Sequence, residues 1–216
     1  MLKTLVKASS ISNLTDARYF SAWEVKWLGY CLDPDSSDFV RPDQLQAIRS
    51  WVDSVELIGE FGNQALPDIV QTAATLQLDA IQLSRTLPTE WLPELPDLPV
   101  IQELVLTHDI SAQTLHSQLM AYGPYVSYFL LDFTRNGPTW AEIQEEHSQL
   151  PVGLLRSFCN DFPILLAFDW TPDNLEEVLY HIAPSGISIK GGAEEKVGLK
   201  SFEEMDRIFE LLQEEE

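Results

Sequence analysis

Eight short apolar runs recur along the chain, and the way they alternate with helix-like segments constrains the fold more than any other feature. The runs are nearly continuous in apolar residues, as expected of parallel strands that are covered on both faces. The predicted strands begin at Leu5 and then occupy residues 26–32, 54–59, 79–83, 100–107, 126–132, 162–167 and 187–190.

Helix signals lie between the predicted strands. Asn13 or Thr15 can cap a first helix that runs to about Trp23. Pro42 opens the second helix at a position where proline is tolerated. The remaining helices are predicted at residues 67–76, 89–95, 111–122, 140–150, 172–181 and 202–213.

Eight strands alternating with eight helices predict an α/β fold, a single (β/α)₈ TIM barrel that spans residues 1–216. The rival fold is an open doubly wound sheet, but no Gly-x-Gly-x-x-Gly follows any strand. Ligands bind at the carboxyl ends of the strands in such barrels. The turn at Ser9 and Ser10, after the first strand, is therefore the first candidate for a functional site.

The composition narrows the classes of partner. A net charge of −21 opposes binding to nucleic acid or to an anionic membrane. No apolar run approaches the length of a membrane span and no signal-peptide pattern opens the chain, so we expect a cytoplasmic protein. Cys31 and Cys159 are expected to be buried free thiols, and the four scattered histidines show no metal-ligand spacing, so no metal site is predicted.

Several motifs resemble those of the phosphoribosylanthranilate isomerases of tryptophan biosynthesis. The opening run is similar to the family's Lys-x-Cys-Gly-Ile-Thr-Asn-x-x-Asp-Ala, and residues 59–64 are similar to its Gly-Val-Phe-Val-Asn-Gln. Residues 78–83 resemble the fourth-strand signature, and Leu130-Leu131-Asp132 resembles the sixth-strand motif. The last strand and its loop add Gly186, Gly192, Glu194, Gly198 and Lys200. The chain thus resembles a divergent member of this family, whose fold is a barrel of the ribulose-phosphate-binding type.

The resemblance implies an aldose–ketose isomerase, an intramolecular oxidoreductase. The family performs an Amadori rearrangement, which opens a ribosyl ring and converts an aminoaldose to an aminoketose without a metal or organic cofactor. A cysteine on the first strand acts as base and an aspartate on the sixth strand as acid. The implied partner is a small molecule, a phosphorylated sugar derivative, and family members occur as monomers and as homodimers.

The proposed catalytic residues depart from this pattern in part. Asp132 keeps the identity of the family's acid, whereas Ser9 stands where the base cysteine is expected. A serine hydroxyl is a far weaker acid than a thiol and needs an adjacent base to act. Lys7 lies two residues earlier on the strand, so its side chain is expected on the same side as that of Ser9. Ser10 replaces a glycine of the motif.

The ligand-binding positions depart further. Asp38 stands where the family has an arginine for the anthranilate carboxylate, and Ser84, followed by Arg85, replaces a histidine. In the family, a glycine pair after strand seven leaves room for the substrate phosphate. Phe168 and Asp169 stand at these two positions here. The candidate anion-binding residues that remain are Lys190, Gly191 and Gly192.

Three hypotheses follow. The first, which these departures favour, is a barrel with a degraded active site that lacks the isomerase activity and serves as a binding or interaction protein, with Phe168, Trp140 and Trp170 at an apolar mouth. The second is a working isomerase with an atypical site. The third is another small-molecule enzyme on the same barrel, with Asp132 and Asp169 as an acid/base pair.

Overall fold

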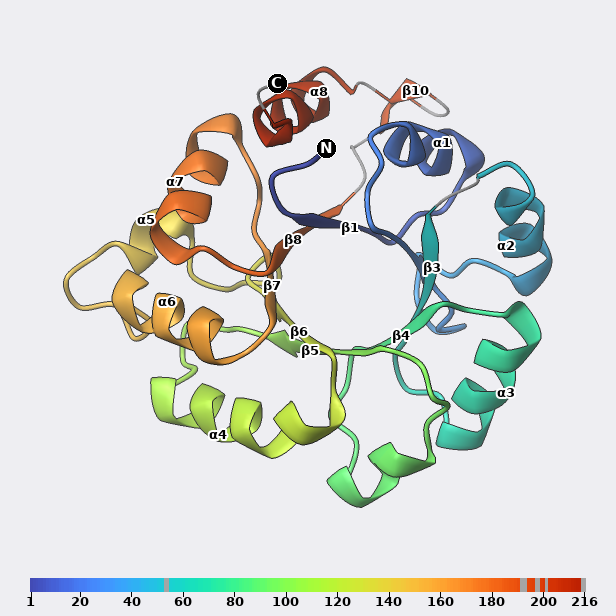
Figure 1. Ribbon diagram of the computed structural model, residues 1–216, viewed down its shortest axis with the longest axis horizontal. Coiled ribbons are helices and arrows are strands. Elements are labelled where there is room, and N and C mark those ends of the chain that lie inside the picture. Colours follow the sequence, from blue (N-terminus) through green and yellow to red (C-terminus); the bar gives the residue numbers. More distant parts are fainter. Residues whose placement is uncertain (53–54, 191–193, 197–198, 201, 215–216) are drawn as a thin grey trace.

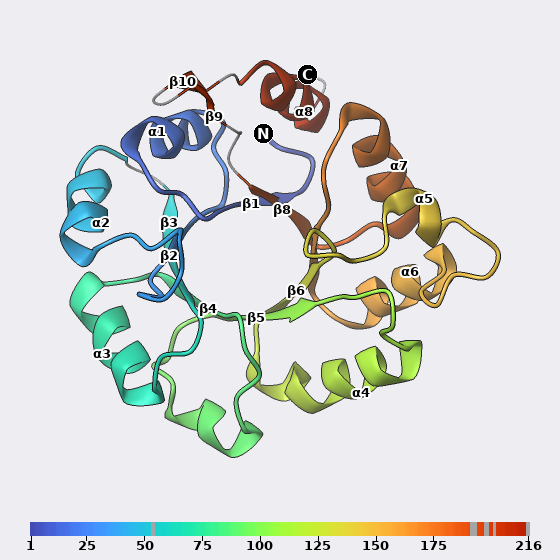
Figure 2. The same cartoon turned by 180° about the vertical axis from the view of Figure 1, so that it is seen from behind.

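The computed structural model describes residues 1–52, 55–190, 194–196, 199–200 and 202–214. Eight parallel strands form a closed barrel in the order β1-β2-β3-β4-β5-β6-β7-β8. Figure 1 shows this ring of strands enclosed by a ring of helices, and Figure 2 shows it from behind. The strands are β1 (Leu5–Ser9), β2 (Trp27–Cys31), β3 (Glu56–Phe61), β4 (Ala80–Leu83), β5 (Val100–Val105), β6 (Tyr128–Asp132), β7 (Ile164–Ala167) and β8 (Gly186–Lys190).

The segments between the strands are mostly helical, as the sequence predicts. The helices are α1 (Leu14–Ala22), α2 (Pro42–Arg49), α3 (Leu66–Leu76), η1 (Thr89–Glu94), α4 (Ala112–Tyr122), η2 (Gly123–Tyr125), α5 (Trp140–Ile143), α6 (Val152–Asp161), α7 (Pro172–Ile182) and α8 (Glu203–Leu212). Two short strands, β9 (Glu194–Lys196) and β10 (Leu199–Lys200), pair between β8 and α8. The predicted TIM barrel is confirmed.

One helix prediction was wrong. A single helix was expected at residues 140–150, but α5 ends at Ile143 and a separate helix, α6, begins after Pro151. The start of α5 follows from its capping box, in which Thr139 and Glu142 bond to each other's backbone. Proline at the N-cap of α6 marks the second start, because it ends one segment and is tolerated at the opening of the next.

The core has two parts, one on each side of the strands. The larger part lies between the strands and the helices, and the smaller part is an apolar layer inside the barrel that includes Trp27, Ile58 and Leu130. Side chains alternate across a strand with period two. The residue two positions beyond each interior residue therefore also faces the barrel axis, and this places Glu60 of β3 and Asp132 of β6 inside the barrel.

The two ends of the described chain lie together. Leu2 pairs with Gln213, and the amide of Lys3 donates to the carbonyl of Leu212. Figure 1 shows the N-terminus beside α8. Within the described residues, no helix combines the length and the apolar character required to cross a membrane.

Candidate active site

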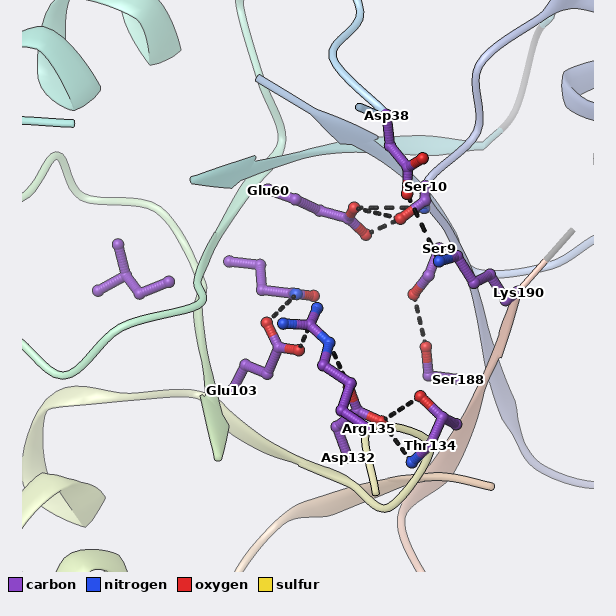
Figure 3. Close-up of polar contacts among 12 residues, drawn as sticks. Ser9, Ser10, Asp38, Glu60, Glu103, Asp132, Thr134, Arg135, Ser188 and Lys190 are labelled. Atoms are coloured by element: carbon purple, nitrogen blue, oxygen red, sulfur yellow. Dashed lines mark hydrogen bonds and ion pairs between the residues drawn. The ribbon is translucent and has the colours of Figure 1, made fainter. Parts of the chain in front are cut away.

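A cavity of about 680 Å³ opens at the carboxyl ends of the barrel strands, and its size suits a small organic ligand. Figure 3 shows the polar side chains that gather around it from several strands. The lining includes Ser9, Ser10, Asp38, Ser84, Arg85, Asp132, Phe168, Asp169 and Lys190, which are all candidate positions from the sequence. Gly191 and Gly192 lie outside the described residues.

Lys7 and Ser9 lie on the same side of β1 and contact each other. The fully buried Lys7 donates from Nζ to Ser9 Oγ over 2.6 Å, and Ser9 Oγ lies 2.6 Å from Ser188 Oγ on β8. Lys7 also forms an ion pair with Glu60, with Nζ 2.5 Å from Oε1. An ammonium group is a donor without acceptor capacity. In this arrangement Lys7 holds the Ser9 oxygen but does not remove the proton from it.

Glu60 places a carboxylate beside the turn that follows β1. It accepts hydrogen bonds from Lys7 Nζ and, at Oε2, from the backbone N (3.2 Å) and Oγ (3.3 Å) of Ser10. Ser10 has a φ of 52°, in the left-handed region that favours glycine. Its two hydrogen bonds to Glu60 help to hold this turn, so the serine that replaces a motif glycine orients the carboxylate.

Space for Glu60 comes from a glycine on the strand between β1 and β3. A Cβ atom added to Gly29 of β2 would lie 2.2 Å from Glu60 Oε1 and 2.8 Å from Lys7 Nζ. A side chain at position 29 would therefore displace the ends of the Glu60 and Lys7 side chains, which pair over β2.

Two carboxylates share one guanidinium group at the opposite side of the cavity. Arg135 Nε lies 3.1 Å from Asp132 Oδ2, and its Nη2 lies 3.0 Å from Glu103 Oε1. The backbone N and Oγ1 of Thr134 donate to Asp132 Oδ1 over 2.8 and 2.7 Å. Gln82 Nε2 donates to Glu103 Oε2 over 3.1 Å. These contacts fix the orientation of the Asp132 carboxylate toward the cavity (Figure 3).

Burial raises the pKa of Glu103 above its ordinary value. Arg135 opposes the rise because its positive charge favours the ionised form, while the charges of Asp132 and Glu60 add to it. The unit thus places one guanidinium group between two carboxylates, of which Glu103 is the one shifted toward its protonated form.

Asp38, which stands where the family has an arginine, has a cation beside it. Asp38 pairs with Lys190, with Oδ2 3.4 Å from Nζ, so the negative charge is not isolated.

Arg85 donates from Nη2 to the carbonyl of Gln64 over 2.7 Å. Among the described residues, Arg85 Nε and Gln82 Oε1 are buried without a hydrogen-bond partner. Both side chains line the cavity, so an unpaired donor and an unpaired acceptor lie within its wall.

Phe168 belongs to an aromatic cluster above β6 and β7. Its ring stacks on Phe133 at 4.3 Å and meets Trp140 and Trp170 edge to face. Phe168, Trp140 and Trp170 are all buried, so they are not the exposed aromatic side chains of the first hypothesis, although Phe168 and Trp170 line the cavity. Asp169 is exposed and lines the cavity. The Phe168 ring, which stands where the motif has a glycine, is thus held in place largely by the neighbouring rings.

The two cysteines offer no substitute for the missing thiol base. Both are free, but Cys31 is only half-buried and lines the cavity, so the expectation that it is buried was wrong. It ends β2, where the strand reaches the cavity. Burial raises the pKa of both thiols, that of Cys159 to about 12, which disfavours the thiolate.

Glu60, Glu103 and Arg135 were missed by the sequence reasoning. Glu60 was assigned to a loop because the third strand was ended at residue 59, whereas β3 continues to Phe61. A charged residue between Gly59 and Phe61, where the resembled motif has valine, was the available signal. In the described part of the chain, no group of three or more His, Cys, Asp or Glu is arranged to hold a metal ion.

Comparison with known proteins decides the family. The model for N-(5'-phosphoribosyl)anthranilate isomerase (PRA isomerase) matches residues 6–211. The chain belongs to this family. It is 29% identical to the N-(5'-phosphoribosyl)anthranilate isomerase of Trichormus variabilis over 187 residues, which cover 86% of this chain and 87% of the relative.

Solved structures support the same fold. A phosphoribosylanthranilate isomerase in complex with reduced 1-(o-carboxyphenylamino)-1-deoxyribulose 5-phosphate superposes with a TM-score of 0.75 at 21% identity, covering 96% of this chain and 97% of that one. Monomers generated from the dimeric Thermotoga maritima enzyme give a TM-score of 0.74 at 21% identity and the same coverage.

These findings correct the first hypothesis from the sequence, that of a barrel without isomerase activity. The relatives matched over nearly their whole length are named as isomerases, which favours the second hypothesis. The first hypothesis was wrong because it treated each departure from the family's motifs separately, whereas the departing residues have partners in the folded chain. Lys190 faces Asp38, Phe168 packs against other rings, and Glu60 brings a carboxylate next to Ser10.

Proposed function

We propose that the protein is a working phosphoribosylanthranilate isomerase, which converts the aminoaldose N-(5-phosphoribosyl)anthranilate to its aminoketose in the biosynthesis of tryptophan, in the cytoplasm. The observation that carries the proposal is the position of Asp132. It ends β6, lines the cavity and matches the family's acid, in a chain that the family model covers from residue 6 to residue 211.

The first chemical step requires a proton on the ring oxygen of the ribosyl group. We assign this step to Asp132, because its carboxylate ends β6, lines the cavity and matches the family's acid. Opening of the ring leaves an iminium group between the sugar and the anthranilate nitrogen. Loss of the neighbouring C2 proton then gives the enolamine that becomes the ketose.

Cationic and polar groups at the cavity edge are candidates to hold the anionic substrate. Lys190 and Arg85 both line the cavity, and Arg85 Nε is left without a partner among the described residues. Such a buried donor is satisfied when a phosphate or carboxylate oxygen approaches it. Gln82 Oε1 can accept a hydrogen bond from a substrate hydroxyl or amine.

The direct test is turnover of N-(5-phosphoribosyl)anthranilate, followed by the loss of anthranilate fluorescence, together with rescue of a tryptophan auxotroph that lacks the isomerase. Asp132→Asn removes the transferable proton at nearly constant shape, so we expect kcat to fall about 10²–10⁴-fold. Asp161→Asn, on the exposed end of α6, is the matched control and should keep wild-type turnover. Absence of turnover by the wild-type protein would refute the proposal, and an active Asp132→Asn variant would refute the role of Asp132.

A further inference from the structure

The base of the reaction is the open question at this site, because the thiol of the family is absent. Ser9 occupies its place, but its oxygen receives a hydrogen bond from Lys7 and lies within hydrogen-bond distance of Ser188. Ser188 Oγ can accept a hydrogen bond from Ser9 but is not a base, and Lys7 Nζ is a donor that is engaged with Glu60, so neither contact removes the proton from Ser9. Ser9 is thus poorly arranged to abstract a proton.

Glu60 brings a carboxylate to the same end of the barrel. It lines the cavity, is 6% exposed, and is held by the ammonium group of Lys7 and by the backbone N and Oγ of Ser10. These three donors hold the carboxylate in the cavity wall, beside the turn that follows β1. Ser10 and Glu60, which both differ from the family's motif residues, are therefore hydrogen-bonded to each other.

Figure 3 shows that Glu60 and Asp132 lie on opposite sides of the cavity mouth. They come from β3 and β6, which are separated by two strands in the closed barrel. A substrate between them has one carboxyl group on each side, so one can give a proton while the other takes one. A glutamate carboxylate is the base in triosephosphate isomerase, another aldose–ketose isomerase on this fold.

We propose that Glu60 is the catalytic base of this protein and that Ser9 positions Lys7 and the substrate instead of accepting the proton. The inference rests on the proposed isomerase function.

The proton transfers balance without an added reactant. The Glu60 carboxylate takes the C2 proton of the ring-opened iminium form, the C2–H electron pair becomes the C1–C2 double bond, and the C=N π electrons move to nitrogen. Protonated Glu60 then returns the proton to C1. The C2 hydroxyl gives its proton to the Asp132 carboxylate, so both acids regain their starting states and the aminoketose is formed.

Steady-state kinetics with N-(5-phosphoribosyl)anthranilate test this assignment. We expect Glu60→Gln to lower kcat about 10²–10⁴-fold with little change in KM, and Ser9→Ala to lower kcat by about tenfold or less. Glu60→Asp keeps the charge opposite buried Lys7, so it keeps the fold, and we expect it to lower kcat because the carboxylate is withdrawn by one methylene. Glu56→Gln, at the other end of β3, removes an ion pair with Lys26 outside the cavity and should keep wild-type turnover.

A rescue experiment separates a base from a structural residue. Adding Ser9→Cys to Glu60→Gln restores a thiol at the family's base position, and we expect kcat to rise at least tenfold above that of Glu60→Gln alone. The rate of this double variant should increase with pH toward the ordinary pKa of cysteine, about 8.5, whereas wild-type activity should lack that rise.

The outcomes are distinct. No turnover by the wild-type protein refutes the isomerase function and the base together. Turnover by the wild type that survives Glu60→Gln, or that is abolished by Ser9→Ala while Glu60→Gln stays active, refutes the base alone. Loss of kcat in Glu60→Gln with no rescue by Ser9→Cys assigns Glu60 a structural role and also overturns the proposal.

Discussion

Glu103 is an ionisable side chain held in a poorly solvated part of the cavity wall, with an exposed fraction of 4%. Because burial raises its pKa in the folded protein, the folded state binds a proton more tightly than the unfolded chain does. Its favourable contribution to stability is complete below the unfolded pKa, about 4.3, and is lost as the pH rises through the folded pKa. The charge state of this one residue therefore links stability to pH.

We expect Glu103→Gln to gain stability relative to the wild type as the pH rises from about 4 to neutrality, because glutamine cannot ionise. Urea unfolding at several pH values measures the difference in the free energy of unfolding. Glu142→Gln is a control of opposite sign, since hydrogen bonds from Thr139 lower the pKa of Glu142 and its contribution is lost as the pH falls. A difference between Glu103→Gln and the wild type that stays constant with pH would contradict the prediction.

The residues of the site were only partly predictable from the sequence. Motif positions identified Asp132 and Ser9, and the period-two rule placed Lys7 beside Ser9, as the 2.6 Å contact shows. Glu60 and Glu103 lie far from Lys7 and Arg135 in the chain, and their pairing depends on the closure of the barrel. Sequence spacing does not encode which long side chains meet across such an interior.

At the scale of elements, β2 controls whether β1 and β3 can interact. Glycine at position 29 leaves room over this strand for the ends of the Glu60 and Lys7 side chains. We expect Gly29→Ala to push the carboxylate from its place, to lower kcat at least tenfold, and to reduce stability by about 1–3 kcal/mol through overpacking. Turnover of N-(5-phosphoribosyl)anthranilate and thermal unfolding measure the two effects.

Gly153→Ala provides the matched glycine control. Nothing lies within 4 Å of a Cβ added at Gly153, which is in α6. Alanine in a helix is favoured over glycine by about 0.5–1 kcal/mol, so this variant should be slightly more stable and fully active. Equal activity of the two variants would show that the contact of Gly29 with Glu60 does not matter for catalysis.

The strands were more predictable than the residues of the site. A parallel strand buried on both faces is a continuous apolar run, and such a run is visible in the local sequence. All eight predicted strands are found in the barrel, with shifts at their ends. The helices between β6 and β7 were not predicted correctly: the cap at Thr139 is a local signal, but the end of α5 at Ile143 has none of comparable strength. The end of such a helix depends on how its side chains pack in the assembled barrel, which the local sequence does not encode.

At the scale of the whole molecule, the distribution of charge opposes the proposed substrate. The chain has a net charge of −21, and the described residues that line the cavity include more carboxylates than cations. The acidic ones are Asp33, Asp38, Glu60, Glu103, Asp132, Asp169 and Glu204, against Arg85, Arg135 and Lys190. A substrate that carries a phosphate and a carboxylate is repelled during its approach, so recognition depends on a few local cations.

Added salt should therefore help the protein to bind the proposed substrate. The Debye length falls from about 30 Å at 0.01 M to about 10 Å at 0.1 M ionic strength, which screens the long-range repulsion more than the close contacts in the cavity. We expect KM for N-(5-phosphoribosyl)anthranilate to fall severalfold between about 10 and 150 mM sodium chloride, with kcat nearly constant. Sodium sulfate at equal ionic strength should lower KM less, because sulfate competes for the cations that bind phosphate. A KM that rises with sodium chloride would show that attraction by the local cations, not repulsion by the whole molecule, governs the approach of the substrate.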